Sequence, residues 1–191
     1  AKKPILINDL KLIIKAIDQY EKKEFKKIRN KSLILIGFSG GFRRSELVNI
    51  EYEDLEFVNE GIKIFIKRSK TDQSGEGSIK AIPYFNNKEF CPVNKLMDWI
   101  KYNNIKDGKI FSISDKSVAL ILKKYALLAG LDPNKYGGHS LRSGFATSAA
   151  EAGAEERNIM AMTGHKTTQM VRRYINEANL FKNNALNKIK I

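Results

Sequence analysis

The first hydrophobic pattern of the chain follows helical spacing. Its apolar residues recur at the positions that share one face of a helix: Leu10, Ile13, Ile14, Ile17 and Tyr20. This face predicts a core helix, with Asn8 or Asp9 as its N-cap. The run 33–38, LILIGF, is apolar on all sides and predicts a buried helix, although periodicity alone does not separate it from a strand. Gly40 and Gly41 are expected to end it.

Three short segments then have the composition of strands. They are LEFV (55–58), IKIFIK (62–67) and IKAIPY (79–84). A turn over 59–61 joins the first two, which indicates a hairpin. The polar connection RSKTDQSGEGS (68–78) contains glycine and is expected to be mobile.

From residue 92 onward the periodicity is helical again. Pro92 fits the first turn of a helix, and a second helix fits 115–129. Ser140 is a candidate cap for a helix rich in small residues that Gly153 ends. Shorter helical patterns follow at 155–162 and from 169. The predicted fold is therefore a single domain over 1–191, mainly α with a small three-stranded antiparallel β-sheet.

Composition adds a strong electrostatic signal. The 34 Lys and Arg against 21 Asp and Glu leave a net charge of +13, which favours polyanionic partners and predicts salt-dependent nucleic-acid binding. Solubility alone is the plain alternative reading of this charge. A single cysteine, Cys91, excludes an intramolecular disulfide, so nothing favours secretion. No segment reaches the roughly 20 apolar residues of a membrane span.

Two Arg-containing pairs are candidates for anion binding. Arg43 and Glu46 are three residues apart, so a helical turn would place them on one face. A permanent charge beside an apolar segment needs an anionic partner, which is either internal or a ligand. His139 and Arg142 have the same spacing at a helix start, where free N–H groups favour anions. An ordinary ion pair, or a capping histidine with a solvated arginine, remains the structural alternative.

His165 and Tyr174 pose a geometric question. Nine residues at about 100° each would place them on opposite faces of one continuous helix. They share a site only if the chain bends between them, and the segment GHKTTQ (164–169) permits such a break. Otherwise, Tyr174 is a core aromatic residue.

In chain order, these pieces resemble the tyrosine recombinase (phage integrase) family. The matching boxes are Gly-Phe-Arg43-Arg-Ser-Glu46-Leu, Ser-Lys70-Thr, His139-Ser-Leu-Arg142, Gly-His165 and Tyr174, and the resemblance spans about 33–176. The family places its first arginine at the position of Arg43, which leaves Arg44 for the DNA backbone or the surface. The resemblance implies the catalytic core of a DNA breaking and rejoining enzyme.

The implied roles match what the cleavage of a phosphodiester requires chemically. Two planar guanidinium groups, those of Arg43 and Arg142, would bind the charge that builds on a phosphodiester under attack. Tyr174 would be the nucleophile, and it needs a base because the pKa of tyrosine is about 10. The candidate base is His139. Glu46 would orient Arg43.

The proton donor and the remaining histidine follow from the same resemblance. Lys70 matches the family lysine that would protonate the departing 5′ oxygen. Lys63, Lys67 and Lys80 are competitors for this role, because they also line a basic strand edge. His165 would hydrogen-bond the phosphate and help to seat the tyrosine.

The resemblance also implies the cofactors and partners. The 3′-phosphotyrosyl product conserves the energy of the broken bond, so no ATP is needed, and the sequence has neither a nucleotide-binding phosphate loop nor a cysteine cluster for zinc. We expect no cofactor, no metal and no membrane partner. The expected partners are double-stranded DNA and other protomers of a synaptic tetramer. A tail helix over about 175–191 would dock on a neighbouring protomer, or alternatively on its own domain.

Several readings of the function remain open. Segments such as KTDQSGEG resemble those of integrases from bacterial mobile elements more than those of chromosome-dimer resolvases. Such an enzyme would act in the cytoplasm on the nucleoid. One alternative is a type IB topoisomerase-like nicking and closing enzyme. Another is a non-catalytic helix-turn-helix module built from 145–175. The chain has no initial Met, and we expect an N-terminal DNA-binding arm to precede it in a longer protein.

Overall fold

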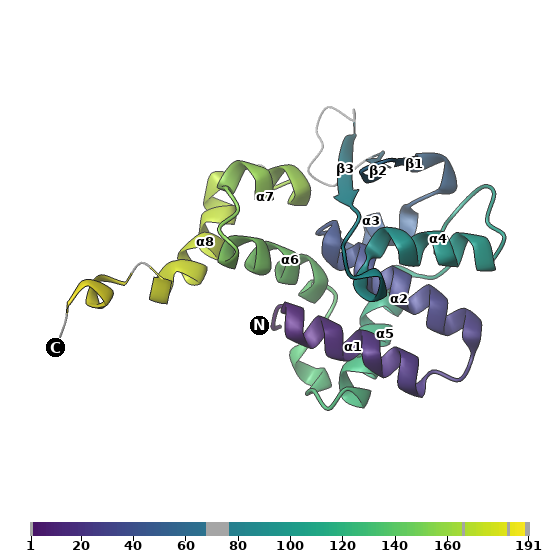
Figure 1. Cartoon of the computed structure of the whole chain (residues 1–191), viewed down its shortest axis with the longest axis horizontal. Coiled ribbons are helices and arrows are strands. Elements are labelled where there is room, and N and C mark those ends of the chain that lie inside the picture. Colours follow the sequence, from purple (N-terminus) through teal and green to yellow (C-terminus); the bar gives the residue numbers. More distant parts are fainter. Residues whose placement is uncertain (1, 68–76, 166, 183, 190–191) are drawn as a thin grey trace.

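The computed structural model describes residues 2–67, 77–165, 167–182 and 184–189 (Figure 1). Its larger part is a layer of helices beneath a small sheet. The helices of this part are α1 (Ile7–Tyr20), α2 (Glu24–Ser39), α3 (Arg44–Asn49), α4 (Pro92–Tyr102) and α5 (Asp115–Leu128). Helix α2 is central, since it packs on α1, α3 and α4, and its segment 33–38 is fully buried. The predicted buried helix is therefore confirmed, and it begins at Glu24.

The sheet is antiparallel with the order β1-β2-β3, as predicted. Its strands are β1 (Leu55–Val58), β2 (Gly61–Ile66) and β3 (Ser78–Pro83). Alternate residues of β2 and β3 face the helices, and among them Ile64 and Ile82 are buried. Lys80 pairs with Ile64 and shares this inner face, so the sheet presents one cation to the protein interior.

A second group of helices lies beside the first (Figure 1). It consists of α6 (Ser140–Glu151), α7 (Glu156–Thr163) and α8 (Thr168–Lys182), which enclose a small apolar cluster of Ala146, Ala150, Ile159 and Val171. Helix α6 connects the groups because it also packs on α2. Gly144 lets α6 approach the segment before α1 closely, since a Cβ there would lie 2.1 Å from the carbonyl oxygen of Ile5. No helix in the described ranges is long and apolar enough to cross a membrane.

Two predicted helix caps are wrong. The N-cap of α1 is Leu6, and Asn8 and Asp9 lie within the first turn. Asp9 instead accepts a hydrogen bond from the Tyr136 hydroxyl at 2.9 Å, a tertiary partner that local sequence does not reveal. Ser140 is the first residue of α6 rather than its cap, because its hydroxyl accepts a bond from the Gly137 N–H instead.

The C-terminal segment also differs from the expected tail helix over about 175–191. Helix α8 continues through Tyr174 to Lys182, and a short 3₁₀ helix, η4 (Ala185–Lys188), follows. Asn184 starts the new turn by accepting a hydrogen bond from the Leu186 N–H at 2.9 Å. Phe181 is 86% exposed, and η4 lies away from the rest of the molecule (Figure 1). Ile175 and Ala178 still pack on the apolar cluster of α6, α7 and α8, whereas the large apolar side chains from Leu180 to Ile189 are exposed.

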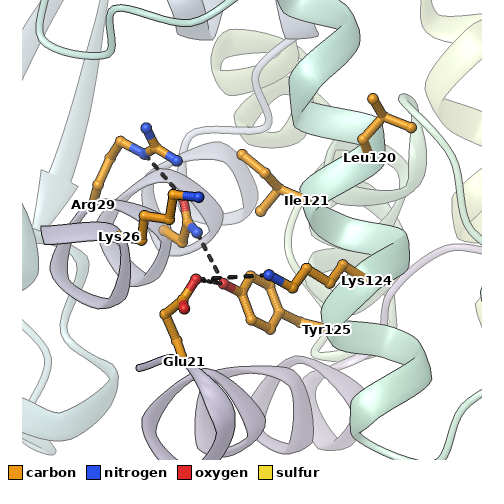
Figure 2. A pocket seen from close by; sticks show the side chains of 8 residues that line it. Glu21, Lys26, Arg29, Leu120, Ile121, Lys124 and Tyr125 are labelled. Atoms are coloured by element: carbon orange, nitrogen blue, oxygen red, sulfur yellow. Dashed lines mark hydrogen bonds and ion pairs between the residues drawn. The ribbon is translucent and has the colours of Figure 1, made fainter. Parts of the chain in front are cut away.

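A polar cluster connects the end of α1 with α2 and α5 (Figure 2). The Tyr125 hydroxyl donates to Glu21 at 2.7 Å and accepts from the Asn30 amide at 3.1 Å. Burial, followed by the bond to Glu21, raises the pKa of Tyr125 to about 12. The hollow beside it measures about 200 Å³. None of the predicted site residues lines this hollow, so we assign the cluster to the joining of three helices.

Candidate functional site

The candidate site is built around the turn that follows α2. Gly40 caps this helix, and Gly41 has a φ of +58°, a left-handed conformation that favours glycine. The turn reverses the chain so that Arg43 becomes the N-cap of α3. The two glycines noted in the sequence therefore do more than end a helix. They set the position from which the Arg43 side chain departs.

The predicted pair of Arg43 and Glu46 is present. One Glu46 carboxylate oxygen accepts a hydrogen bond from the Arg43 backbone N–H at 2.9 Å, and the other lies 3.5 Å from Arg43 Nη1. The Glu46 side chain is only 7% exposed. This carboxylate holds the guanidinium from one side, which leaves its other donors for a ligand.

Arg142 reaches the same turn from α6. Its Nη1 donates to the Gly41 carbonyl oxygen at 2.9 Å, and the residue is 6% exposed. Within the described part of the chain, its Nη2 is buried and has no hydrogen-bond partner. Burial, with the nearby charge of Arg43, lowers the pKa of Arg142 to about 10. An unpaired buried donor on a cation is costly, and an anion bound between the two arginines would satisfy it.

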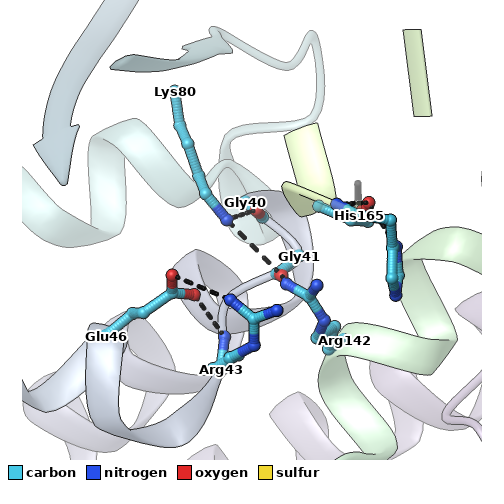
Figure 3. Close-up of polar contacts among 8 residues, drawn as sticks. Gly40, Gly41, Arg43, Glu46, Lys80, Arg142 and His165 are labelled. Carbon is cyan, nitrogen blue, oxygen red and sulfur yellow. Dashed lines mark hydrogen bonds and ion pairs between the residues drawn. The ribbon is translucent and has the colours of Figure 1, made fainter. Parts of the chain in front are cut away.

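Lys80 is a third cation at this turn (Figure 3). Its side chain extends from β3, and Nζ donates to the Gly40 carbonyl oxygen at 2.8 Å, with the Gly41 oxygen at 3.5 Å. Burial lowers the pKa of Lys80 to about 7; Glu46 opposes this shift, whereas Arg142 and Arg43 add to it. The sheet and the two groups of helices thus converge on one turn.

His165 and Tyr174 are brought together by a bend, as their spacing requires. Gly164 ends α7 in a left-handed conformation, and the next helix begins at Thr168. The rings of His165 and Tyr174 have centroids 6.2 Å apart. The Thr163 hydroxyl lies 2.6 Å from His165 Nδ1, so one ring nitrogen is occupied and Nε2 remains for another group. The bend that the sequence allowed therefore brings the two rings together, and their shared catalytic role stays a prediction.

The remaining predicted site residues are His139 and the candidate lysines. His139 is the exposed N-cap residue of α6, and its side chain makes no capping hydrogen bond. Lys70 lies outside the described residues, as does most of the connection 68–78 that was expected to be mobile. Lys67 pairs with Glu51 and, at 3.4 Å, with Asp54. Among the competing lysines in the described ranges, only Lys80 contacts the glycine turn.

Sequence reasoning gave too little weight to Lys80 and did not identify Thr163. Lys80 stands two residues before the buried Ile82 on the same strand face, which is a weak signal for burial. Ile79 lies on the opposite face and obscures this alternation, because it is apolar but exposed. Thr163 shows no such signal, since its contact depends on the bend at Gly164.

The lowered pKa of His165 predicts a pH-dependent stability. Burial, followed by the charges of Arg142, Arg43 and Lys80, lowers this pKa from 6.5 to about 4. Between these values the unfolded chain binds more protons than the folded chain, so the free energy of unfolding decreases as the pH falls. In urea unfolding at about pH 7 and about pH 5, the unmodified chain should lose more stability than His165→Gln. Equal losses of stability in the two proteins would contradict the lowered pKa of His165.

Comparisons with known proteins show the family of the chain. The sequence profile of the phage integrase family matches residues 5–180, so the chain belongs to this family. It is 47% identical over 200 residues to the integrase/recombinase xerD homolog of Selenomonas ruminantium, covering 98% of this chain and 58% of that protein. The chain thus spans little more than half the length of this relative.

Solved structures share the fold. The post-cleavage complex of the XerH site-specific recombinase with a palindromic difH substrate has a TM-score of 0.74 at 21% identity, covering 95% of this chain and 53% of that one. The Tn1549 transposon integrase in complex with transposon right end DNA has a TM-score of 0.65 at 18% identity, covering 95% and 66%. At these identities the likeness defines the fold, which is that of tyrosine recombinases.

Proposed function

We propose that the protein is a site-specific recombinase that cleaves and rejoins DNA strands through Tyr174. The observation that carries the proposal is the buried, unpaired Nη2 of Arg142, which lies on the guanidinium whose Nη1 is fixed to the turn beside Arg43. A phosphodiester bound there would satisfy this donor. The ring contact of His165 with Tyr174 supports placing the tyrosine at the same site.

The mechanism follows from the proposed roles. The Tyr174 oxygen attacks the phosphorus, its proton passes to His139, and the bond from phosphorus to the 5′ oxygen breaks. Lys70 gives the departing 5′ oxygen a proton, so that a 5′-hydroxyl end and a 3′-phosphotyrosyl link remain. Arg43 and Arg142 hold the charge on the non-bridging oxygens during the attack.

His165 would contribute Nε2 to the phosphate. Its Nδ1 is occupied by Thr163 at 2.6 Å, and this contact fixes the ring orientation. Its lowered pKa keeps the imidazole uncharged near neutral pH, so it would act as a hydrogen-bonding group rather than as a charge. Rejoining is the reverse reaction, in which a 5′-hydroxyl attacks the phosphotyrosyl bond. No external energy source is then required.

The proposed substrate is duplex DNA, and the proposed setting is the integration or excision of a bacterial mobile element in the cytoplasm. The net charge of +13 supports a polyanionic substrate. The names of the relatives include both a xerD homolog and a transposon integrase, and each of the two solved complexes contains DNA. The transposon integrase and the resemblance of the segment KTDQSGEG (70–77) support the mobile-element setting.

We also propose that the C-terminal tail docks on a neighbouring protomer in a synaptic tetramer. Leu180, Phe181 and Leu186 are all exposed, and burial of such residues drives association. We expect Phe181→Ser to reduce the number of protomers on a DNA duplex, as measured by light scattering, without loss of single-protomer binding. Leu127→Ser, at an equally apolar exposed position on α5, is the control. An unchanged assembly in Phe181→Ser would contradict this role of the tail.

A trapping experiment tests the main proposal. The chain is incubated with a pool of nicked duplexes of randomised sequence, in which the short 5′-hydroxyl strand diffuses away after cleavage and rejoining is prevented. A slowly migrating band in SDS is expected, and sequencing of the trapped DNA would yield the preferred site.

The same experiment separates the alternative functions. Trapping without any sequence preference, together with relaxation of supercoiled plasmid, would favour a topoisomerase-like enzyme. DNA binding without any trapped band would contradict strand cleavage and favour a helix-turn-helix module. A band enriched in one sequence supports the recombinase.

A further inference from the structure

Lys80 stands out as a buried cation. It is 3% exposed, whereas lysine is rarely buried to this extent without a partner. No carboxylate in the described ranges forms an ion pair with it; its nearest acceptors are the backbone carbonyls of Gly40 and Gly41. Its Nζ also lies 4.3 Å from the centre of the Phe42 ring, within range of a cation–π contact. Each of these contacts involves a residue of the turn after α2.

The turn that Lys80 contacts is also the one to which both arginines are connected. Arg43 follows it directly in sequence, and Arg142 is anchored to it through the Gly41 oxygen at 2.9 Å. The carbonyl groups at the end of α2 carry the negative end of the helix dipole, which favours a cation there. The Lys80 contact thus joins β3 to the turn that Arg142 also contacts from α6.

We propose that Lys80 is a positioning residue that holds the turn over 40–42 and thereby fixes Arg43 and Arg142 relative to one another. This inference rests on the proposed function for its effect on catalysis. It differs from a role of Lys80 as proton donor, because Nζ is directed at the backbone (Figure 3). To deliver a proton to a 5′ oxygen, the buried side chain would have to leave these contacts.

The inference is tested by the rate at which variants cleave the duplex that the trapping experiment recovers. Lys80→Met keeps an unbranched side chain of similar length but removes the donor, and Lys80→Arg keeps charge and donors. We expect cleavage by Lys80→Met to slow by about 10²-fold, the cost of misplacing reacting groups by about 1 Å. Lys80→Arg should recover most of this loss. Lys101→Met removes one exposed charge on α4 and is the control for DNA affinity.

The affinity measurement separates positioning from general loss of charge. Lys80→Met should bind the duplex within about threefold of Lys101→Met, since neither substitution removes more than one positive charge. A cleavage rate of Lys80→Met equal to that of the unmodified chain would overturn the proposal. A loss of cleavage rate in Lys80→Met that weaker DNA binding fully explains would also overturn the proposal.

A substrate with sulfur in place of the bridging 5′ oxygen separates positioning from proton donation. A thiolate leaves without protonation, so the defect of a missing general acid disappears on this substrate. The defect of Lys80→Met should persist, because the arginines remain misplaced. Disappearance of the defect would identify Lys80 as the proton donor and overturn the positioning role.

Hydrogen exchange tests the same inference without any activity. The amides of Gly40, Gly41 and Phe42 donate to Ile36, Phe38 and Gly37 at 2.9, 3.1 and 3.1 Å. In Lys80→Met these amides should exchange faster, whereas the amides of α5 should not change. Unchanged exchange at the turn would overturn the proposal.

Two further outcomes remain decisive. If the unmodified chain forms no trapped complex, the proposed function fails, and hydrogen exchange still decides the role of Lys80. If Lys80→Met does not fold, Lys80→Gln takes its place in each assay, because it removes the charge and shortens the reach to Gly40. Faster exchange at the turn is again expected, and unchanged exchange would overturn the inference.

Discussion

Replacement of Tyr174 by phenylalanine is expected to abolish the covalent complex with DNA while leaving DNA binding unchanged. The substitution removes only the hydroxyl oxygen, the atom that would bond to phosphorus. The ring should keep its place beside His165 and its packing on the cluster of α6, α7 and α8. The expected result is therefore a complete loss of the SDS-resistant band at an unchanged affinity.

The control for Tyr174→Phe is Tyr102→Phe. Tyr102 is an exposed tyrosine at the end of α4, away from the glycine turn, and its loss should leave the band intact. Mass spectrometry of the trapped protein should locate the DNA adduct on a peptide that contains Tyr174. A band that persists in Tyr174→Phe would disprove the nucleophile assignment.

Arg142→Ala is expected to reduce cleavage by about 10³-fold, the upper range for removing one group that stabilises developing charge. Nη1 of this guanidinium donates to the Gly41 carbonyl oxygen, and Nη2 has no partner among the described residues, so the proposed phosphate would bond to Nη2. DNA binding should survive, because it depends on the remaining cations of a chain with a net charge of +13. The salt dependence of binding should weaken by about one unit of slope.

Arg157→Ala provides the matched comparison for Arg142→Ala. Its side chain is 82% exposed on α7, so the substitution removes one charge without touching the glycine turn. Single-turnover cleavage and binding at several salt concentrations would be measured for both variants. Loss of all binding in Arg142→Ala, or cleavage equal to that of Arg157→Ala, would contradict the proposed role of Arg142.

Strongly periodic segments made the fold class predictable. The helices around Ile14 and Trp99, the three strands and their antiparallel order all follow from local hydrophobic spacing and turn residues. Helix caps were less predictable, because Asp9 and Ser140 use their side chains in contacts other than capping. The break after Lys182 was also missed, since the apolar spacing of the tail continues across it.

The members of the site were likewise mostly visible in the sequence, but their arrangement was not. The order of short boxes named Arg43, Glu46, Arg142, His165 and Tyr174, and the structure brings these residues towards one turn. The roles of His139 and Lys70 remain predictions, because His139 is exposed at the start of α6 and Lys70 lies outside the described residues.

The sequence by itself determined the elements, the excess of positive charge and the residue types of the site, because these depend on local spacing and composition. Only the tertiary structure decided which cation meets which carbonyl. Lys80 was one of several basic residues on a strand edge until the register of β2 and β3 turned it to the inner face. Its contact with Gly40, 40 residues away in sequence, arises from packing between the sheet and α2, which no local pattern encodes.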